Sequence, residues 1–334
     1  MSAQIDSNDK SAPVGATFPQ LEIPETLAAG PGPGNTDPRV LERFAAAGCA
    51  DHMQADVVRG MKEAKAMLRE VFGTRNAYTF AVCGTGWDGL DCAFSPILPG
   101  DTVVSFVNGT FSGIDDFNIR LKASTPAELA QDPLNPKPAN VTTVNVAHGQ
   151  SVTGDVIEAV LAEHKPMWAF MAHWETGSGR VNDIQGFNDA CEKHGVMGIV
   201  DAVSSLGISH FNIDDYPAVT TWASCPQKGI LGLPLTYAPV SFNDKVIELL
   251  RKRGCYSYVH HPILEARHWC IADGQDVETA AYHRTHSGYA VASFHEALRL
   301  LLLHGRQQKS EDYAFFEKGL RAAIEAWAAR LLQT

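Results

Sequence analysis

Four apolar runs in the sequence are each followed by residue types that can take part in chemistry. Lys228 lies in the segment WASCPQKGILGLP, among small, apolar, glycine and proline residues and without a neighbouring acidic residue. Lysine is strongly hydrated and is usually left in water, so a single amine in this setting is unusual. Asp201 ends the run VMGIVD, and Thr176 comes shortly after MWAFMAH. Thr85 and Gly86 belong to the glycine-rich turn that follows YTFAVC.

These residues lie at the ends of predicted strands, in a chain where strand and helix patterns alternate. Strands are expected over 78–83, 101–107, 141–146, 167–173, 196–201, 218–224 and 235–241. Helices are expected over 39–71, 86–96, 111–122, 153–165 and 182–195 and in the last part of the chain. This alternation predicts an α/β fold with a mostly parallel sheet and helices on both faces. Ligands bind outside the carboxyl ends of such strands, so the four positions are expected to converge.

An amine, a carboxylate, a hydroxyl and a glycine-rich turn at a helix start are the groups that pyridoxal phosphate requires. A lysine forms a Schiff base with its aldehyde, and an aspartate pairs with the pyridine nitrogen so that the ring accepts electrons. Backbone N–H groups at a helix start hold the phosphate. Each feature has an ordinary alternative: a solvent-exposed lysine, a helix-capping aspartate, or a nucleotide-binding turn. The turn GTGWDG matches the dinucleotide pattern loosely, but no strand-ending acidic residue follows at the usual distance of about 20 residues.

The chain resembles the class V, fold type I pyridoxal-phosphate aminotransferases, on the branch of the alanine–glyoxylate and serine–glyoxylate (serine–pyruvate) aminotransferases. The resemblance covers about residues 28 to 330, and VDAVSSLG followed by a Gln-Lys pair is its most specific part. The matching segments are GPGPGNTDPRV, VFGTRNAYTFAVCGTG, LPGDTVVSFVNGTFSG, HWETGSGRVNDI, VDAVSSLG, PQKGILGLP and YHRTH. The resemblance implies a three-layer large domain with a mostly parallel, seven-stranded sheet.

The resemblance also implies roles for residues around the cofactor ring. Lys228 would form the Schiff base and later move the proton between the substrate carbon and the cofactor. Asp201 would hold the pyridinium nitrogen, and Thr176 would lie beside the ring oxygen. Phe111 stands where the family has an aromatic residue stacked on the ring, and Val203 would pack on the opposite face.

Further residues would hold the cofactor phosphate by the same resemblance. The phosphate-binding set comprises Thr85, Gly86 and Gln227, with Trp87 beside the turn. Tyr282 and Thr285 match positions that reach the phosphate of a neighbouring subunit, so a homodimer with a shared active site is implied. The segment 32–35 matches the N-terminal loop on the substrate side.

The resemblance divides the chain into three parts. It predicts a flexible N-terminal arm over 1–27, a cofactor-binding large domain over 28–305 and a helix over 306–334. In the family this helix leads into a small α/β domain, which carries an arginine for the substrate carboxylate. That domain is expected to be missing or truncated here. Arg284, in the unusual segment YHRTHS, is one candidate substitute, against the simpler interpretation of a surface arginine.

The resemblance implies an aminotransferase that exchanges an amino group between a small amino acid, such as alanine or serine, and a 2-oxo acid such as glyoxylate or pyruvate. Two alternatives stay open. One is a lyase or other elimination enzyme with the same cofactor, suggested by the altered YHRTHS segment and the missing carboxylate-binding arginine. The other is a catalytically impaired homologue that binds the cofactor or a partner.

Composition excludes several other classes of function. The net charge is −11 with no long basic run, which argues against nucleic acid and anionic membranes as partners. No apolar run reaches the roughly 18 residues of a membrane span. The seven cysteines are dispersed without a C-x-x-C pair, as expected for a cytoplasmic protein without structural zinc. No metal site is expected at the histidines of 260–286, because they lack acidic or thiol partners at ligand spacing.

Overall fold

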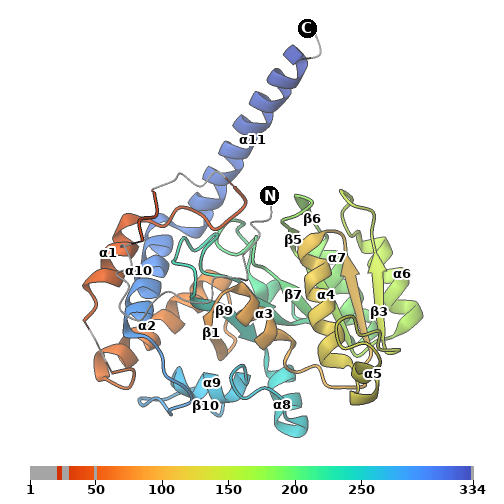
Figure 1. Cartoon of the computed structure of the whole chain (residues 1–334), viewed down its shortest axis with the longest axis horizontal. Coiled ribbons are helices and arrows are strands. Elements are labelled where there is room, and N and C mark those ends of the chain that lie inside the picture. Colours follow the sequence, from red (N-terminus) through yellow and green to blue (C-terminus); the bar gives the residue numbers. More distant parts are fainter. Residues whose placement is uncertain (1–20, 25–29, 49–50, 332–334) are drawn as a thin grey trace, which may run out of the picture.

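The fold is built on a seven-stranded sheet that runs through the middle of the molecule (Figure 1). The computed structural model describes residues 21–24, 30–48 and 51–331, so most of the arm expected over 1–27 lies outside the described residues. The strand order is β1-β9-β8-β7-β4-β2-β3. The strands are β1 Tyr78–Gly84, β2 Val103–Val107, β3 Val141–Asn145, β4 Trp168–Ala172, β7 Met197–Asp201, β8 Val219–Ala223 and β9 Thr236–Phe242.

The sheet is parallel except at β9, which pairs antiparallel with both β8 and β1. Strands β4, β7 and β8 are buried along their whole length, which explains their continuous apolar sequences. The expectation of an α/β fold with a mostly parallel seven-stranded sheet is therefore confirmed. Two short hairpins, β5 Trp174–Glu175 with β6 Arg180–Val181 and β10 Ile271–Ala272 with β11 Gln275–Asp276, lie outside this sheet.

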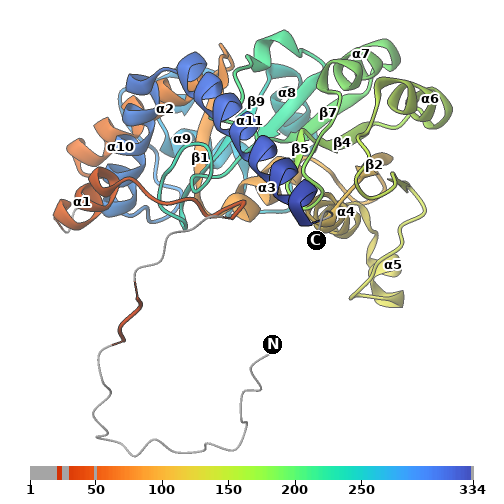
Figure 2. The same cartoon turned by 90° about the horizontal axis from the view of Figure 1, so that it is seen from above.

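Helices lie on both faces of the sheet (Figure 2). The helices α3 and α4 run along one face, and α6 and α7 run along the other. The bounds are α3 Gly86–Phe94, α4 Thr110–Ala123, α5 Pro126–Gln131, α6 Gly154–His164, α7 Ile184–His194, α8 Asp244–Arg253 and α9 Pro262–His268. A further helical layer contains α1 Pro38–Ala46, α2 Ala55–Phe72 and α10 Gly288–His304, and α10 packs against both of the others.

The helical pattern expected over 39–71 is divided in the structure between α1 and α2. The carboxylate of Asp51 accepts a hydrogen bond from the backbone N–H of Met53 in the intervening turn, which leads into α2. At its other end α2 stops at Gly73, whose left-handed φ of 62° suits a glycine at a helix end. Local turn chemistry thus breaks an otherwise continuous helical periodicity.

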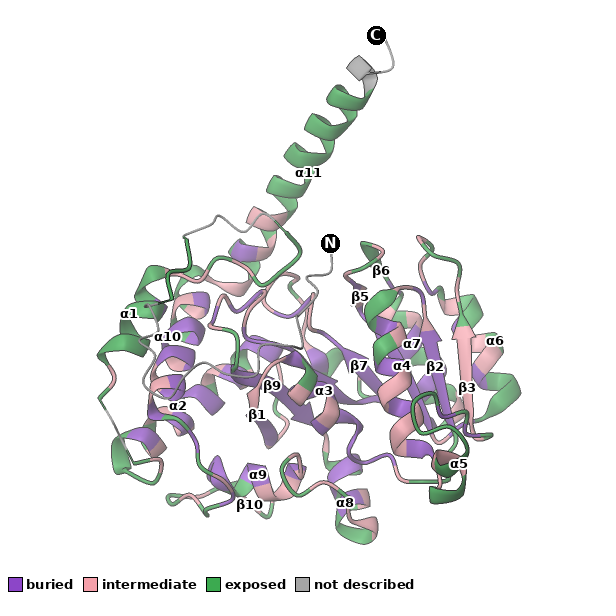
Figure 3. Ribbon diagram, in the orientation of Figure 1, coloured by how far each residue is buried: buried purple, intermediate pink, exposed green. Residues whose placement is uncertain are grey.

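The last helix, α11 Arg306–Leu331, begins against the large fold and then projects away from it (Figure 1). Its first turns contain partly buried residues, whereas its later turns are exposed (Figure 3). None of the helices in the described part of the chain is both long and apolar enough to cross a membrane. The six cysteines that the structure describes are all free thiols.

Candidate active site

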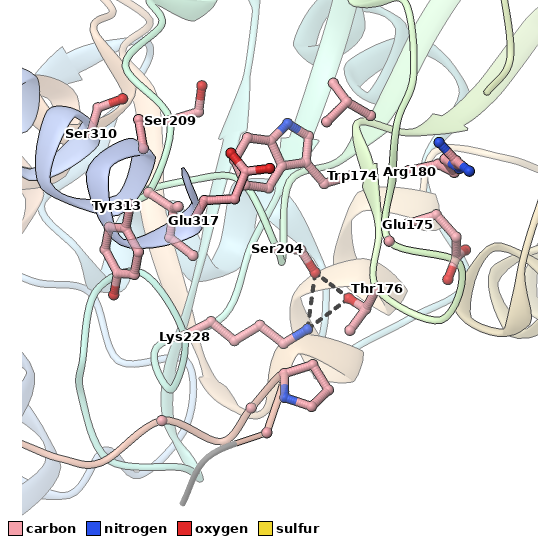
Figure 4. A pocket seen from close by; sticks show the side chains of 18 of the residues that line it. Trp174, Glu175, Thr176, Arg180, Ser204, Ser209, Lys228, Ser310, Tyr313 and Glu317 are labelled. Carbon is pink, nitrogen blue, oxygen red and sulfur yellow. Dashed lines mark hydrogen bonds between the residues drawn. The ribbon is translucent and has the colours of Figure 1, made fainter. Parts of the chain in front are cut away.

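The Lys228 amine lies where the ends of several strands meet. Its Nζ is 2.9 Å from Thr176 Oγ1 and 2.9 Å from Ser204 Oγ (Figure 4). Lys228 follows β8, Thr176 follows β5, and Ser204 follows β7, so sheet topology brings together residues that are distant in sequence. Burial lowers the pKa of Lys228, and the nearby acidic groups compensate only in part. The predicted convergence of Lys228 and Thr176 is therefore observed.

The carboxyl group of Asp201 is enclosed at the end of β7. Only 5% of the residue is exposed, and its Oδ1 accepts a hydrogen bond from the backbone N–H of Val203 at 2.7 Å. Burial raises the pKa of Asp201 to about 7, although the Val203 N–H and the Lys228 charge act in the opposite direction. A cationic or N–H group placed against this carboxyl would reverse the shift and be held firmly.

One cavity is lined by most of the residues that were predicted from the sequence to bind the cofactor ring and phosphate. It has a volume of about 160 Å³. The predicted residues that line it are Gly86, Trp87, Phe111, Thr176, Asp201, Val203, Gln227 and Lys228. The rings of Trp87 and Phe111 are stacked with centroids 6.4 Å apart, and Lys228 Nζ lies 5.5 Å from the centroid of Phe111. The apolar side chains that line the cavity suit the faces of a planar ring. The Asp201 carboxyl and the Thr176 hydroxyl suit polar groups at the edge of such a ring.

The start of α3 offers unused hydrogen-bond donors to the same cavity. Within the residues that the structure describes, the backbone N–H groups of Gly86 and Trp87 have no acceptor. The side-chain amide of Gln227 also makes no hydrogen bond there, and its Oε1 is buried. Unpaired donors at a helix start form an anion site. The residues present therefore fit the phosphate and the ring of pyridoxal phosphate.

Thr85 contacts Asp88 in this structure, and its predicted role at the phosphate stays a prediction. Both of its donors are already used, since its N–H and its hydroxyl donate to Asp88 Oδ2 at 2.7 Å and 3.1 Å. Thr85 caps α3 and does not line the cavity. The hydroxyl can still turn toward a phosphate, because an O–H group rotates about its C–O bond.

A larger cavity of about 650 Å³ opens from the other side of Lys228. The loop residues Gly32 and Gly34, from the segment predicted on the substrate side, line it together with Trp174. One stripe of α11 forms the opposite wall (Figure 4), made by Ser310, Tyr313, Glu317 and Arg321. This space is large enough for a small organic acid beside the amine.

Sequence reasoning missed several of these residues. Ser204 lies inside the motif VDAVSSLG, but that motif did not indicate that its hydroxyl contacts Lys228. Trp174 lies in the matching segment HWETGSGRVNDI, two residues before the predicted Thr176. Tyr313 carries no local signal, because its position depends on how α11 packs.

Comparison with known proteins decides the family. Alanine–glyoxylate aminotransferase of Mus musculus is 31% identical over 291 residues, which cover 85% of this chain and 64% of the relative. That of Oryctolagus cuniculus is 30% identical over 303 residues, covering 89% of this chain and 71% of the relative. The chain belongs to the alanine–glyoxylate aminotransferase family. The resemblance stated from the sequence is confirmed, although the chain spans less than two thirds of the mouse relative.

Solved structures agree on the fold. The alanine–glyoxylate aminotransferase of Nostoc sp. has a TM-score of 0.78 at 25% identity, covering 89% of this chain and 73% of that one. The ureidoglycine–glyoxylate aminotransferase of Bacillus subtilis has a TM-score of 0.80 at 22% identity, covering 92% and 74%. A scan against protein-family models gave no match.

The structure shows where the residues of the unusual segment YHRTHS lie. Arg284 Nε donates to Glu265 Oε2 at 3.0 Å, and His286 Nε2 lies 3.2 Å from Glu265 Oε1. Glu265 and the side chain of His286 are fully buried, and the Arg284 side chain is 17% exposed. Neither cavity beside Lys228 is lined by Arg284. Arg284 is therefore not a surface arginine, because its side chain is largely buried and pairs with Glu265. It is also not placed to anchor a substrate beside Lys228, because it lines neither cavity.

Tyr282 and Thr285 also lie away from the cavities beside Lys228. Both are exposed, and their hydroxyl oxygens are 3.5 Å apart. Their predicted contact with a neighbouring subunit stays a prediction.

Alanine at position 32 should disturb Lys228 directly. Gly32 has a φ of +125°, and a Cβ there would lie 3.0 Å from both Cε and Cγ of Lys228. We expect Gly32→Ala to lower the rate at which the Lys228 amine reacts with pyridoxal phosphate by about tenfold or more, since small displacements at a reacting group are costly. Gly30→Ala is the matched control, because a Cβ at Gly30 meets no atom within 4 Å. Equal rates for the two variants would contradict this account of the loop.

Removing the Glu265 carboxylate should destabilise the protein. Glu265→Ala leaves the Arg284 guanidinium and His286 buried without their partner, which we expect to cost about 3 kcal/mol of unfolding free energy. Lys193→Ala, which removes an exposed ion pair with Glu158, should change it by no more than about 0.5 kcal/mol. Urea denaturation followed by circular dichroism measures the unfolding free energy of both variants. Similar small effects would show that the contacts of Glu265 with Arg284 and His286 are not important for stability.

Proposed function

We propose that the chain is a pyridoxal-phosphate-dependent aminotransferase that uses Lys228. It would move an amino group between a small amino acid, such as alanine or serine, and a 2-oxo acid such as glyoxylate or pyruvate. The observation that carries the proposal is the Lys228 amine, partly desolvated and hydrogen-bonded to two hydroxyl groups in a cavity that also holds Asp201. The alanine–glyoxylate substrates are those of the named relatives.

Specific residues would hold the cofactor. The N–H groups of Gly86 and Trp87, with the Gln227 amide, would bind the phosphate. Asp201 would accept the pyridine N–H, and Thr176 would lie at the ring oxygen. The apolar walls of this space, which Phe111, Trp87 and Val203 supply, would enclose the faces of the ring. When bound, pyridoxal phosphate withdraws electrons from the carbon that carries the amino group.

The chain's own groups would handle the protons. Because burial lowers the pKa of Lys228, its Nζ is neutral more often than a surface lysine and can accept a proton. Thr176 and Ser204 orient this nitrogen, since each hydroxyl lies 2.9 Å from it. The buried Asp201 carboxylate would stabilise positive charge at the pyridine nitrogen.

We also propose a domain arrangement, an oligomeric state and a location for the chain. Residues 28–305 would form the cofactor-binding domain, from which α11 leads out. The exposed hydroxyls of Tyr282 and Thr285 support a homodimer in which they reach the partner's cofactor. The free thiols support a reducing, cytoplasmic location.

The visible absorption spectrum of the protein with added pyridoxal phosphate tests the function. We expect a cofactor band that converts to the pyridoxamine spectrum when alanine or serine is added, and that returns with glyoxylate or pyruvate. Lys228→Ala should lower the turnover by at least about a thousandfold, because it removes the nucleophile and the base together.

Three results would contradict the proposal. A band that never converts with any amino donor would leave a cofactor-binding protein without transaminase activity. Steady release of ammonia without a 2-oxo acid would indicate the lyase. Unchanged turnover in Lys228→Ala would remove the assigned role of the amine.

A further inference from the structure

A carboxylate lies at the helix start where the phosphate would bind. Asp88 is in the first turn of α3, and its Oδ2 accepts the hydrogen bonds from Thr85 described above. A carboxylate there stabilises the helix in the absence of other anions. The N–H groups of Gly86 and Trp87, which have no acceptor in the described part of the chain, belong to the same turn. A phosphate bound to them would therefore lie close to a second anion, and like charges at short range repel.

His260 lies against this carboxylate from outside the helix. Its Nε2 is 3.4 Å from Asp88 Oδ1, and its Nδ1 is 2.7 Å from Asp91 Oδ2. Burial disfavours the charged imidazole, but the hydrogen bonds to Asp88 and Asp91 outweigh burial and raise the pKa of His260 to about 9. The side chain is only 16% exposed, so the imidazolium is held in place.

A second cation completes the cluster. Lys122 Nζ from α4 lies 2.7 Å from Asp91 Oδ1. The two carboxylates, Asp88 and Asp91, are thus matched by two cations, His260 and Lys122, and the cluster carries no net charge. Loss of the imidazolium would leave one uncompensated negative charge beside the helix start.

We propose that His260 is a positioning residue for the cofactor phosphate, because its imidazolium neutralises Asp88 and so permits a dianion at the N–H groups of Gly86 and Trp87. The inference rests on the proposed use of pyridoxal phosphate. His260 does not line the cofactor cavity, and it acts only through Asp88. No local pattern indicates this role, since 169 residues separate His260 from Asp91.

Paired ligands that differ only in the phosphate test the inference. The dissociation constants of pyridoxal phosphate and of pyridoxal, which lacks the phosphate, are measured by absorbance and fluorescence titration. We expect His260→Gln to weaken pyridoxal phosphate binding by about tenfold and to leave pyridoxal binding unchanged. His260→Lys, which keeps a positive charge, should bind pyridoxal phosphate nearly as tightly as the wild type.

Two further variants make the test specific. The double variant Asp88→Asn with His260→Gln should regain the lost affinity, because the repelling carboxylate is also removed. His295→Gln is the matched control, since His295 pairs with Glu63 through Nε2 at 2.8 Å on the surface of another helix. If His260→Gln does not fold, Asp88→Asn alone decides: it should bind pyridoxal phosphate at least as tightly as the wild type.

Several outcomes would overturn the inference. Equal losses for both ligands would mean that His260 supports the structure only, and no loss would mean that Asp88 does not oppose the phosphate. Weaker phosphate-dependent binding in Asp88→Asn would mean that the carboxylate assists the site. In these cases the wild type still binds pyridoxal phosphate, so the proposed function survives. A wild type that binds neither ligand would remove both.

Discussion

The amine of Lys228 is held in a partly buried site by two hydroxyl groups, and among the residues that the structure describes no carboxylate pairs with it. The other features of the site depend on this arrangement. Taking a lysine out of water disfavours its charged form, so burial lowers its pKa. The polar contacts to Thr176 and Ser204 satisfy the nitrogen whether or not it is protonated. An amine in this state can react, whereas the same amine in bulk water would be protonated almost entirely at neutral pH.

Sheet topology supplies the rest of the site. The parallel strands β7 and β8 end side by side, so Asp201 lies at the end of one strand and Lys228 follows the next. The segments that bear these groups are fixed by the buried strands behind them, which is how a rigid core holds reactive loops. Tertiary contacts add to this support, because the buried Lys309 on α11 donates to the backbone carbonyl of Gly229, directly after Lys228. The last helix is therefore coupled to the loop that carries Lys228, and it also forms a wall of the larger cavity.

Sequence reasoning recovered what is encoded locally. Lys228 and Asp201 could be identified because each follows an apolar run, and strand ends converge in any parallel sheet. Residues placed by tertiary packing could not be found in this way, as Tyr313 on α11 shows. Arg284 shows the same limit, because it pairs with Glu265 on α9 and no local sequence pattern indicates this contact.

Borohydride reduction of the protein mixed with pyridoxal phosphate, followed by peptide mass mapping, identifies the amine that holds the cofactor. Reduction fixes the cofactor covalently to the amine that holds it. We expect one labelled peptide, in which Lys228 carries the mass of the reduced cofactor. Label on the other buried amines, Lys309 or Lys65, or spread over surface lysines with Lys228 unlabelled, would contradict it.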